Sequence, residues 1–180
     1  MEVITTARLT LRDFTEDDEK SVHGYASDPE VVRYMPWGPN TMKDTSDFVK
    51  RSLAQLQEQP RKDYSLAVVL TSQKVLIGGC GIYLVSPEQR EGYIGYVLNR
   101  NYWGKGYATE TAKALLKFGF DQLNLHRISA TCDPANTASA HVLEKIGMQY
   151  EGHLREHKWE KGKWVDSLQY AILDHEFAER

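Results

Sequence analysis

The chain has 180 residues, of which 41% are hydrophobic and 26% are charged, and its formal net charge is −3. This size and composition are typical of one folded domain, which we expect over residues 1–180, and they exclude a disordered or fibrous chain. The acidic balance argues against direct binding of nucleic acid, and the longest central apolar run, residues 66–70, is far too short to span a membrane.

The first third of the chain predicts one strand and three helical segments. The N-terminus lacks the apolar core of a signal peptide, so we expect a cytoplasmic protein with no membrane partner. Alternating apolar and polar residues predict a strand over 8–14, and Thr15 with the acidic residues after it predicts a helix start. Asp28-Pro29 predicts a second short helix, residues 35–40 form a proline-containing loop, and an apolar stripe predicts a third helix over about 44–59.

The rest of the chain alternates strands and helices. Strands are predicted over 64–71, 74–85 and 91–98, which form an antiparallel meander, over 127–132, and on both sides of the turn at 160–163; helices are predicted over 107–123 and from Asn136. Cys80 and Cys132 fall within strands and lack Cys-x-x-Cys spacing, so we expect no metal site and no disulfide. The elements predict an α/β (α+β) fold with a mixed, mostly antiparallel sheet of about seven strands and helices on both faces.

A glycine-rich turn joins the third strand of the meander to the long helix. Residues 98–108 read Leu-Asn-Arg-Asn-Tyr-Trp-Gly-Lys-Gly-Tyr-Ala, which places Gly104 and Gly106 at the helix N-terminus. The first helical amides lack intrahelical acceptors, and glycine lets the backbone approach a phosphate without a Cβ atom, so a pyrophosphate fits here. On its own, such a turn is more often a plain connection. A dinucleotide fingerprint is excluded because Thr109 stands where it needs glycine, and no P-loop sequence is present.

A second motif begins 32 residues after Gly104. Asn136 is an N-cap type residue, Ser139 follows three positions later, and Gly147 stands where the helix is expected to end. Together with Tyr-Trp-Gly-x-Gly-Tyr-Ala-Thr-Glu at 102–110, this pattern resembles the GCN5-related N-acetyltransferase (GNAT) superfamily, in particular its ribosomal-protein N-terminal acetyltransferase (RimJ/RimL-like) branch. The resemblance runs from Thr6-x-Arg8-Leu9-x-Leu11-Arg12 to Glu176-Phe177, nearly the whole chain.

The resemblance implies a sheet that splays in the middle and an acetyl-coenzyme A site between the two motifs. The pantetheine arm would run beside the third strand of the meander, the pyrophosphate would meet the amides of the glycine turn, and the Asn136 side chain would bind the arm from the opposite side. The cofactor-binding residues expected on this basis are Tyr96, Val97, Leu98, Trp103, Gly104, Lys105, Gly106, Tyr107, Ala108, Asn136 and Ser139. Lys105 either adds charge to this site or projects into solvent.

Acetyl transfer to an amine needs a neutral amine and a proton for the departing thiolate, and direct attack needs no covalent enzyme intermediate. Many GNAT relatives carry a tyrosine at the position of Leu143, so Ser139 is the nearest alternative donor; a plain surface hydroxyl is its other role. The resembled branch often has a glutamate where this chain has Tyr93. Glu91, on the same strand face, is then a candidate base acting through water; a solvated glutamate and a water chain remain the alternatives.

The acceptor expected from these features is a primary amine. At pH 7, an α-amino group with a pKa near ~7.8 costs about 1 kcal/mol to deprotonate, whereas a lysine near ~10.4 costs roughly 4.6 kcal/mol. An enzyme without a strong base therefore favours a peptide or protein N-terminus; a polyamine or aminoglycoside-like drug, or a non-catalytic acyl-CoA-binding module, are the alternatives. Tyr34, Trp37 and Tyr93 are expected to line the acceptor pocket, although such aromatic residues also pin helices together. The protein is expected to be a monomer or a homodimer.

Overall fold

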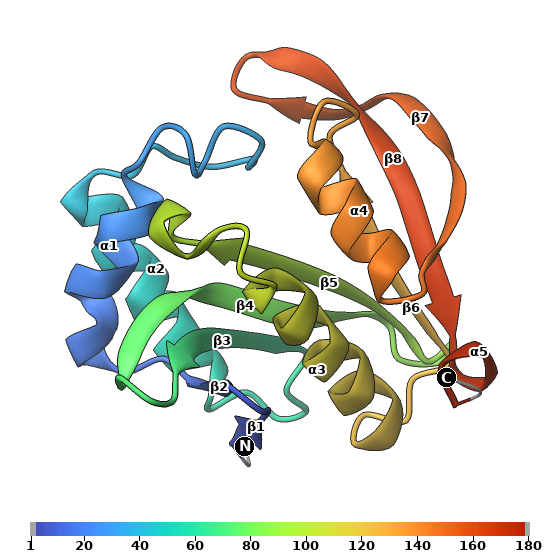
Figure 1. Cartoon of the computed structure of the whole chain (residues 1–180), viewed down its shortest axis with the longest axis horizontal. Coiled ribbons are helices and arrows are strands. Elements are labelled where there is room, and N and C mark those ends of the chain that lie inside the picture. Colours follow the sequence, from blue (N-terminus) through green and yellow to red (C-terminus); the bar gives the residue numbers. More distant parts are fainter. Residues whose placement is uncertain (1–2, 179–180) are drawn as a thin grey trace.

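Eight strands form one mixed sheet in the computed structural model, which describes residues 3–178 (Figure 1). Seven of them confirm the predicted strands, and the additional one is the two-residue β1. Neighbouring strands are antiparallel except β5 and β6, which are parallel, so the predicted meander of β3, β4 and β5 is confirmed. The strands are β1 (Ile4–Thr5), β2 (Leu9–Asp13), β3 (Asp63–Leu70), β4 (Val75–Ser86), β5 (Glu91–Leu98), β6 (Arg127–Cys132), β7 (Gln149–Glu160) and β8 (Lys163–Leu173), in the spatial order β1-β2-β3-β4-β5-β6-β8-β7.

Helices cover both faces of the sheet, as predicted. In the described residues they are α1 (Glu19–Ala26), α2 (Met42–Gln55), α3 (Tyr107–Asp121), α4 (Thr137–Lys145) and α5 (Asp174–Ala178), with short 3₁₀ turns at Glu16–Asp18 (η1) and Arg100–Tyr102 (η2). None of these helices is long and apolar enough to cross a lipid bilayer.

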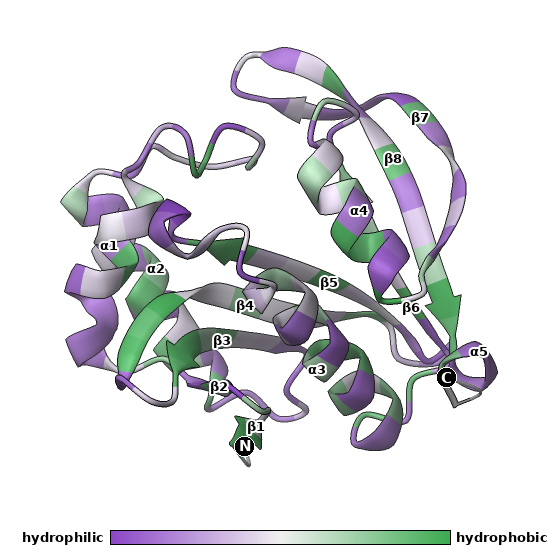
Figure 2. Ribbon diagram, in the orientation of Figure 1, coloured by the Kyte–Doolittle hydropathy of each residue, from purple (hydrophilic) through white to green (hydrophobic). Residues whose placement is uncertain are grey.

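The sheet separates two hydrophobic cores, because successive side chains of a strand point to opposite faces. On β3, Leu66 and Val68 pack into the core under α3 and α4, whereas Ala67 and Val69 pack into the core under α1 and α2. Figure 2 shows the matching pattern on α3, where hydrophobic and hydrophilic residues alternate with the helical turn. The central strands are therefore buried on both sides, and they form a rigid platform for the loops at their ends.

The prediction of a helix at Asp28-Pro29 is wrong. Residues 29–34 form consecutive turns, with one helical hydrogen bond from Val32 N to Asp28 O (3.1 Å). Pro36 disfavours the helical conformation of the residue before it, and Val32 is pinned in the core, so the segment turns instead of extending. Helix α2 begins two residues before its predicted start and ends at Gln55, four residues early.

The sheet splays apart between β5 and β6. These two strands pair over three positions only, the last joining Tyr93 to Ser129. Beyond that point Figure 1 shows β5 and β6 diverging, so the edge of residues 94–98 that faces β6 has no strand partner in the described chain. The splay implied by the resemblance is confirmed, and it opens a gap lined by main-chain groups.

Candidate functional site

The glycine turn between β5 and α3 presents a row of open main-chain amides. Gly104 and Gly106 have φ angles of +72° and +80°, in the left-handed region that favours glycine. Within residues 3–178, the amides of 104–109 have no protein acceptor, and the first helical bond runs from Glu110 N to Gly106 O (3.1 Å). A Cβ atom on Gly104 would have no neighbour within 4 Å. Open amides at the positive end of a helix fit a diphosphate.

An ion pair on the opposite side of this turn fixes its shape. Arg8 Nη1 donates to Lys105 O (2.9 Å), and Arg8 Nε donates to Glu110 Oε2 (2.7 Å). Thr6 Oγ1 donates to Glu110 Oε1 (2.6 Å). Burial raises the pKa of Glu110, but the hydrogen bonds from Thr6 and Arg8 outweigh it, so the pKa of this carboxyl is lowered and it stays ionised. The sequence shows Arg8 only as part of an N-terminal pattern, since its partners lie about a hundred residues away.

The side chains of the turn are themselves held by the protein. Lys105 Nζ donates to Asn101 O (2.9 Å) and lies 5.5 Å from the Tyr102 ring centre. Trp103 Nε1 donates to Leu98 O (2.8 Å), while about half of the Trp103 residue remains exposed. Lys105 was expected either to add charge to the phosphate site or to project into solvent. Its ammonium group instead binds a carbonyl of the turn itself.

Two hydroxyl groups meet across the gap between β5 and α4. Tyr96 Oη lies 3.0 Å from Ser139 Oγ. Burial raises the pKa of Tyr96, although the hydrogen bond with Ser139 lowers it in part, so the phenol keeps its proton at neutral pH. Asn136 caps α4 as predicted, its Oδ1 accepting from Ser139 N (3.2 Å). The pair can donate a proton into the gap, and no pattern in the sequence indicates this role for the Tyr96 hydroxyl.

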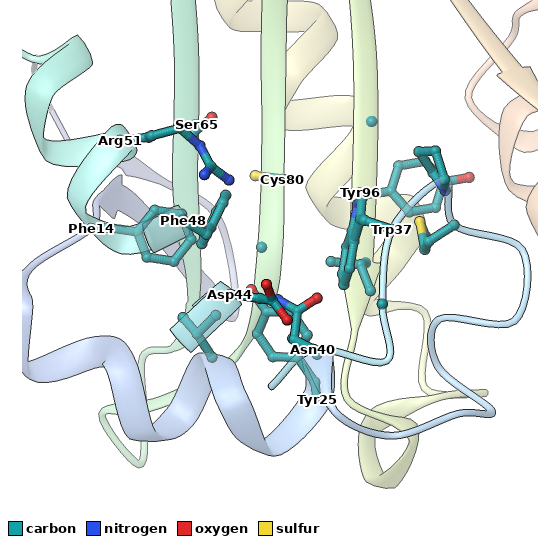
Figure 3. Close-up of a pocket in the computed structure, with 18 of the residues that line it drawn as sticks. Phe14, Tyr25, Trp37, Asn40, Asp44, Phe48, Arg51, Ser65, Cys80 and Tyr96 are labelled. Atoms are coloured by element: carbon teal, nitrogen blue, oxygen red, sulfur yellow. The ribbon is translucent and has the colours of Figure 1, made fainter. Parts of the chain in front are cut away.

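A cavity of about 720 Å³ opens on the α1 and α2 side of β5 (Figure 3). Ser65 on β3 and Gly95 on β5 line its floor, and both are in register with Gly81 on β4, which lies between them. Tyr83 covers Gly81, but a Cβ atom on Gly95 would meet nothing within 4 Å. The cavity is lined by Phe14, Val22, Tyr25, Ala26, 35–40, Asp44, Asp47, Phe48, Arg51, Ser65, Gly79, Cys80, Tyr83, Tyr93 and 95–97.

A second, smaller cavity of about 140 Å³ lies between β5, β6 and α4. It is lined by Tyr34, Asn136 and Ser139, among others. Tyr93 and Tyr96 line both cavities, which therefore meet at β5. The three residues expected on the acceptor side come together here, since Trp37 lines the large cavity, Tyr34 the small one and Tyr93 both.

A model of the acetyltransferase (GNAT) domain matches residues 8–149 of this sequence. The chain belongs to the GNAT acetyltransferase family. It is 40% identical over 174 residues to the uncharacterized N-acetyltransferase YnaD of Bacillus subtilis (strain 168), covering 97% of this chain and 98% of YnaD. The crystal structure of a GNAT-family acetyltransferase from Bacillus anthracis is 38% identical, with a TM-score of 0.86, over 97% of this chain and 99% of that one.

The names of more distant GNAT relatives refer to different acceptors. Spermidine N(1)-acetyltransferase of Escherichia coli (strain K12) is 24% identical over 170 residues, 94% of this chain and 88% of that protein. The structure of RimL, a ribosomal L7/L12 alpha-N-protein acetyltransferase in complex with coenzyme A, shares the fold, with 21% identity and a TM-score of 0.84 over 96% of this chain and 99% of RimL. The chain is therefore an acyltransferase that uses acetyl-coenzyme A and an amine acceptor.

The structure does not bring Glu91, the proposed base of this GNAT enzyme, to either cavity. Glu91 lies at the end of β5 that pairs with β6, and Arg127 Nε donates to its Oε1 (3.3 Å). Arg127 also binds Glu151. An ion-paired carboxylate at the closed end of the splay has no geometric support as a base. Leu143, by contrast, lines the small cavity beside Ser139, so the hydroxyl pair lies close to the position where many GNAT relatives carry tyrosine.

The β7–β8 hairpin reaches across the GNAT site to the loop between α1 and α2. Lys161 Nζ, in the turn of the hairpin, donates to Val32 O (2.8 Å). Lys158 Nζ donates to Thr131 Oγ1 (3.0 Å), and that hydroxyl lies 2.9 Å from Tyr93 Oη. Because these partners lie far apart in the sequence, no local pattern could have predicted that the hairpin contacts both β6 and the loop between α1 and α2.

Proposed function

We propose that this GNAT enzyme acetylates the α-amino group of a peptide or protein N-terminus by direct attack. The observation that carries this proposal is the meeting of the two cavities at Tyr96, on the unpaired edge of β5. An acceptor in the large cavity can reach this edge from the α2 side. The open amides of 104–109 lie at the opposite end of the same edge, where they suit the cofactor.

On the cofactor side, each group has a separate role. The amides of 104–109 bind the diphosphate, the β5 edge at Tyr96-Val97-Leu98 hydrogen-bonds the pantetheine arm, and the Asn136 side-chain amide steadies it. The cofactor, when bound, supplies the activated acetyl group. Tyr96 and Ser139 then donate a proton toward the departing sulfur, since burial keeps the phenol protonated.

The ionisable groups around the cavities favour an amine that loses its proton easily. The pKa of Asp44 is lowered by hydrogen bonds from Thr41, and that of Asp47 by its hydrogen bond and ion pair with Lys43. These carboxylates of the large cavity are weak bases. Deprotonating an α-amino group at pH 7 costs about 1 kcal/mol against roughly 4.6 kcal/mol for a lysine, so the N-terminal amine is the accessible acceptor. It is also the acceptor named for RimL.

A polyamine is the second candidate. Asp44 and Asp47 both line the large cavity, and two carboxylates can attract a chain of ammonium groups. The relative named spermidine N(1)-acetyltransferase, 24% identical to this chain, agrees with that acceptor. An N-terminal peptide and a polyamine differ enough for a single assay to separate them.

Coenzyme A release from acetyl-coenzyme A, measured against a panel of amines, tests both candidates. We expect turnover with short peptides that have a free α-amine. We expect none with lysine-containing peptides whose N-terminus is blocked, because their only free amine is the lysine side chain. Turnover with spermidine and none with peptides would overturn the N-terminal assignment in favour of the polyamine. Binding of acetyl-coenzyme A without turnover on any amine would show a non-catalytic binding module.

A further inference from the structure

We propose that the acceptor carries an anionic group, a carboxylate or a phosphate, about 10 Å from its reacting amine, and that Arg51 binds this group. The inference rests on the proposed function, because it concerns the acceptor of the same site. It assigns a second binding point at the far end of the large cavity.

Arg51 belongs to the face of α2 that looks into the cavity. Asp44, Asp47, Phe48 and Arg51 all line it, and their spacing of three or four residues places them on one helix face. Figure 3 shows the Arg51 side chain extending from α2 toward the interior of the cavity, next to Ser65. The guanidinium therefore lies on the wall opposite the β5 edge.

This guanidinium forms no ion pair with a carboxylate of the described chain, and Asp47, one turn earlier on α2, interacts with it only at longer range. Among the arginines of residues 3–178, Arg33, Arg51 and Arg155 form no ion pair, and of these three only Arg51 lines the cavity. The two carboxylates on its helix face are already engaged, Asp44 with Thr41 and Asp47 with Lys43. A guanidinium presents several donors in one plane, which suits a carboxylate or a phosphate.

The sheet provides the distance between the two ends of the cavity. Ser65, Gly81 and Gly95 are in register on three adjacent strands, and strands lie about 4.8 Å apart, so Ser65 lies roughly 10 Å from Gly95. The β5 end receives the amine, and the Ser65 end faces Arg51. An extended chain covers about 3.4 Å per residue, so a tripeptide spans this distance between its amine and its carboxylate.

Two aromatic rings form part of the wall between the two ends. Phe14 and Phe48 form an edge-to-face pair with ring centres 5.3 Å apart, and both rings line the cavity. Tyr25, 2% exposed, lies close to the floor, since a Cβ atom on Gly79 would be 2.9 Å from its hydroxyl. An acceptor with a partly apolar middle and an acid at its far end matches these rings and the guanidinium of Arg51.

The test compares Ala-Ala-Ala as the free acid with its C-terminal amide in the coenzyme A release assay. We expect the KM of the free acid to be about tenfold lower than that of the amide, the size of one charge-assisted hydrogen-bonded pair. In Arg51→Gln the KM of the acid rises about tenfold and that of the amide stays the same. Arg155→Gln, which changes an unpaired arginine outside both cavities, is the matched control and leaves both KM values unchanged.

The outcomes separate this inference from the function on which it rests. Equal KM values for the acid and the amide in the wild type would overturn the Arg51 assignment while leaving the N-terminal acetyltransferase in place. A lower KM for spermidine in Arg51→Gln, with the peptides unaffected, would also overturn it, because Arg51 would then repel cations instead of binding an acid. Turnover of no amine at all would remove the proposed function itself. An unchanged affinity of Arg51→Gln for coenzyme A shows that the variant is folded.

Discussion

The glycine turn makes a quantitative prediction, because Gly104 differs from Gly95 in backbone conformation but not in available space. A Cβ atom at either position would meet nothing within 4 Å. Gly104 has a φ angle of +72°, at which an L-residue costs roughly 1–2 kcal/mol, whereas the φ angle of Gly95 lies outside the left-handed range. Replacing glycine by alanine at a compatible site stabilises a protein by about 0.4–1 kcal/mol through the unfolded chain.

We therefore expect Gly104→Ala to lower the free energy of unfolding by about 1 kcal/mol, which corresponds to a Tm about 2–4 °C lower for a chain of this size. Gly95→Ala keeps or raises the Tm. Thermal unfolding by circular dichroism measures both, and calorimetry with coenzyme A shows whether the strained turn also binds the cofactor more weakly. Equal Tm values for the two variants would refute the left-handed turn and the amide arrangement that depends on it.

Four further substitutions test other parts of the molecule. Tyr96→Phe is expected to lower kcat about 10²-fold, and Ser139→Ala is expected to lower it by less. The Kd for coenzyme A should stay nearly unchanged in both variants. Full turnover in both would assign thiolate protonation to another group. Gly95→Val fills open space at the cavity floor, so we expect the acceptor KM to rise while the cofactor Kd stays constant, and a normal acceptor KM would place the acceptor elsewhere. Asp18 is buried; burial raises its pKa and the hydrogen bonds from Arg12 and Thr15 outweigh this, so its pKa is lowered. The ionised Asp18 carboxylate therefore stabilises the folded state at any pH above the ordinary carboxyl pKa. This stabilisation is lost as the pH falls through the lowered pKa that Asp18 has in the folded protein. Asp18→Asn should therefore reduce the stability at pH 7 and flatten the acid side of a stability–pH curve measured with urea, and an unaltered curve would contradict this.

The order of the strands and helices could be predicted from the sequence because most elements carry local signals. Alternation identified the meander, and helical spacing identified α3. The helix predicted at Asp28-Pro29 was wrong, since an N-terminal proline signal cannot show that Pro36 and the buried Val32 stop the helix. Local chemistry marks where a helix can begin, whereas tertiary packing decides whether it continues.

The candidate site divides in the same way. The open amides of the glycine turn and the cap at Asn136 follow from local backbone rules, so the sequence was enough to find them. The contact between Tyr96 and Ser139 and the hydrogen bond from Arg8 to Lys105 O join elements that are distant in the chain, and the cavity that Arg51 lines is likewise built from several elements. No spacing in the sequence encodes these contacts, and they were visible only once the sheet was formed.

The two sides of the site are built from different segments of the chain. The groups that we assign to the cofactor come from one continuous stretch, β5 to α4, whereas much of the large cavity, where we propose that the acceptor binds, comes from the N-terminal segment 14–51, which the hairpin contacts at Lys161. On this proposal, exchange of the N-terminal segment or of the hairpin tip changes the amine that is accepted while the cofactor-binding half stays the same. Libraries confined to those two segments are the economical route to new acceptors on this scaffold.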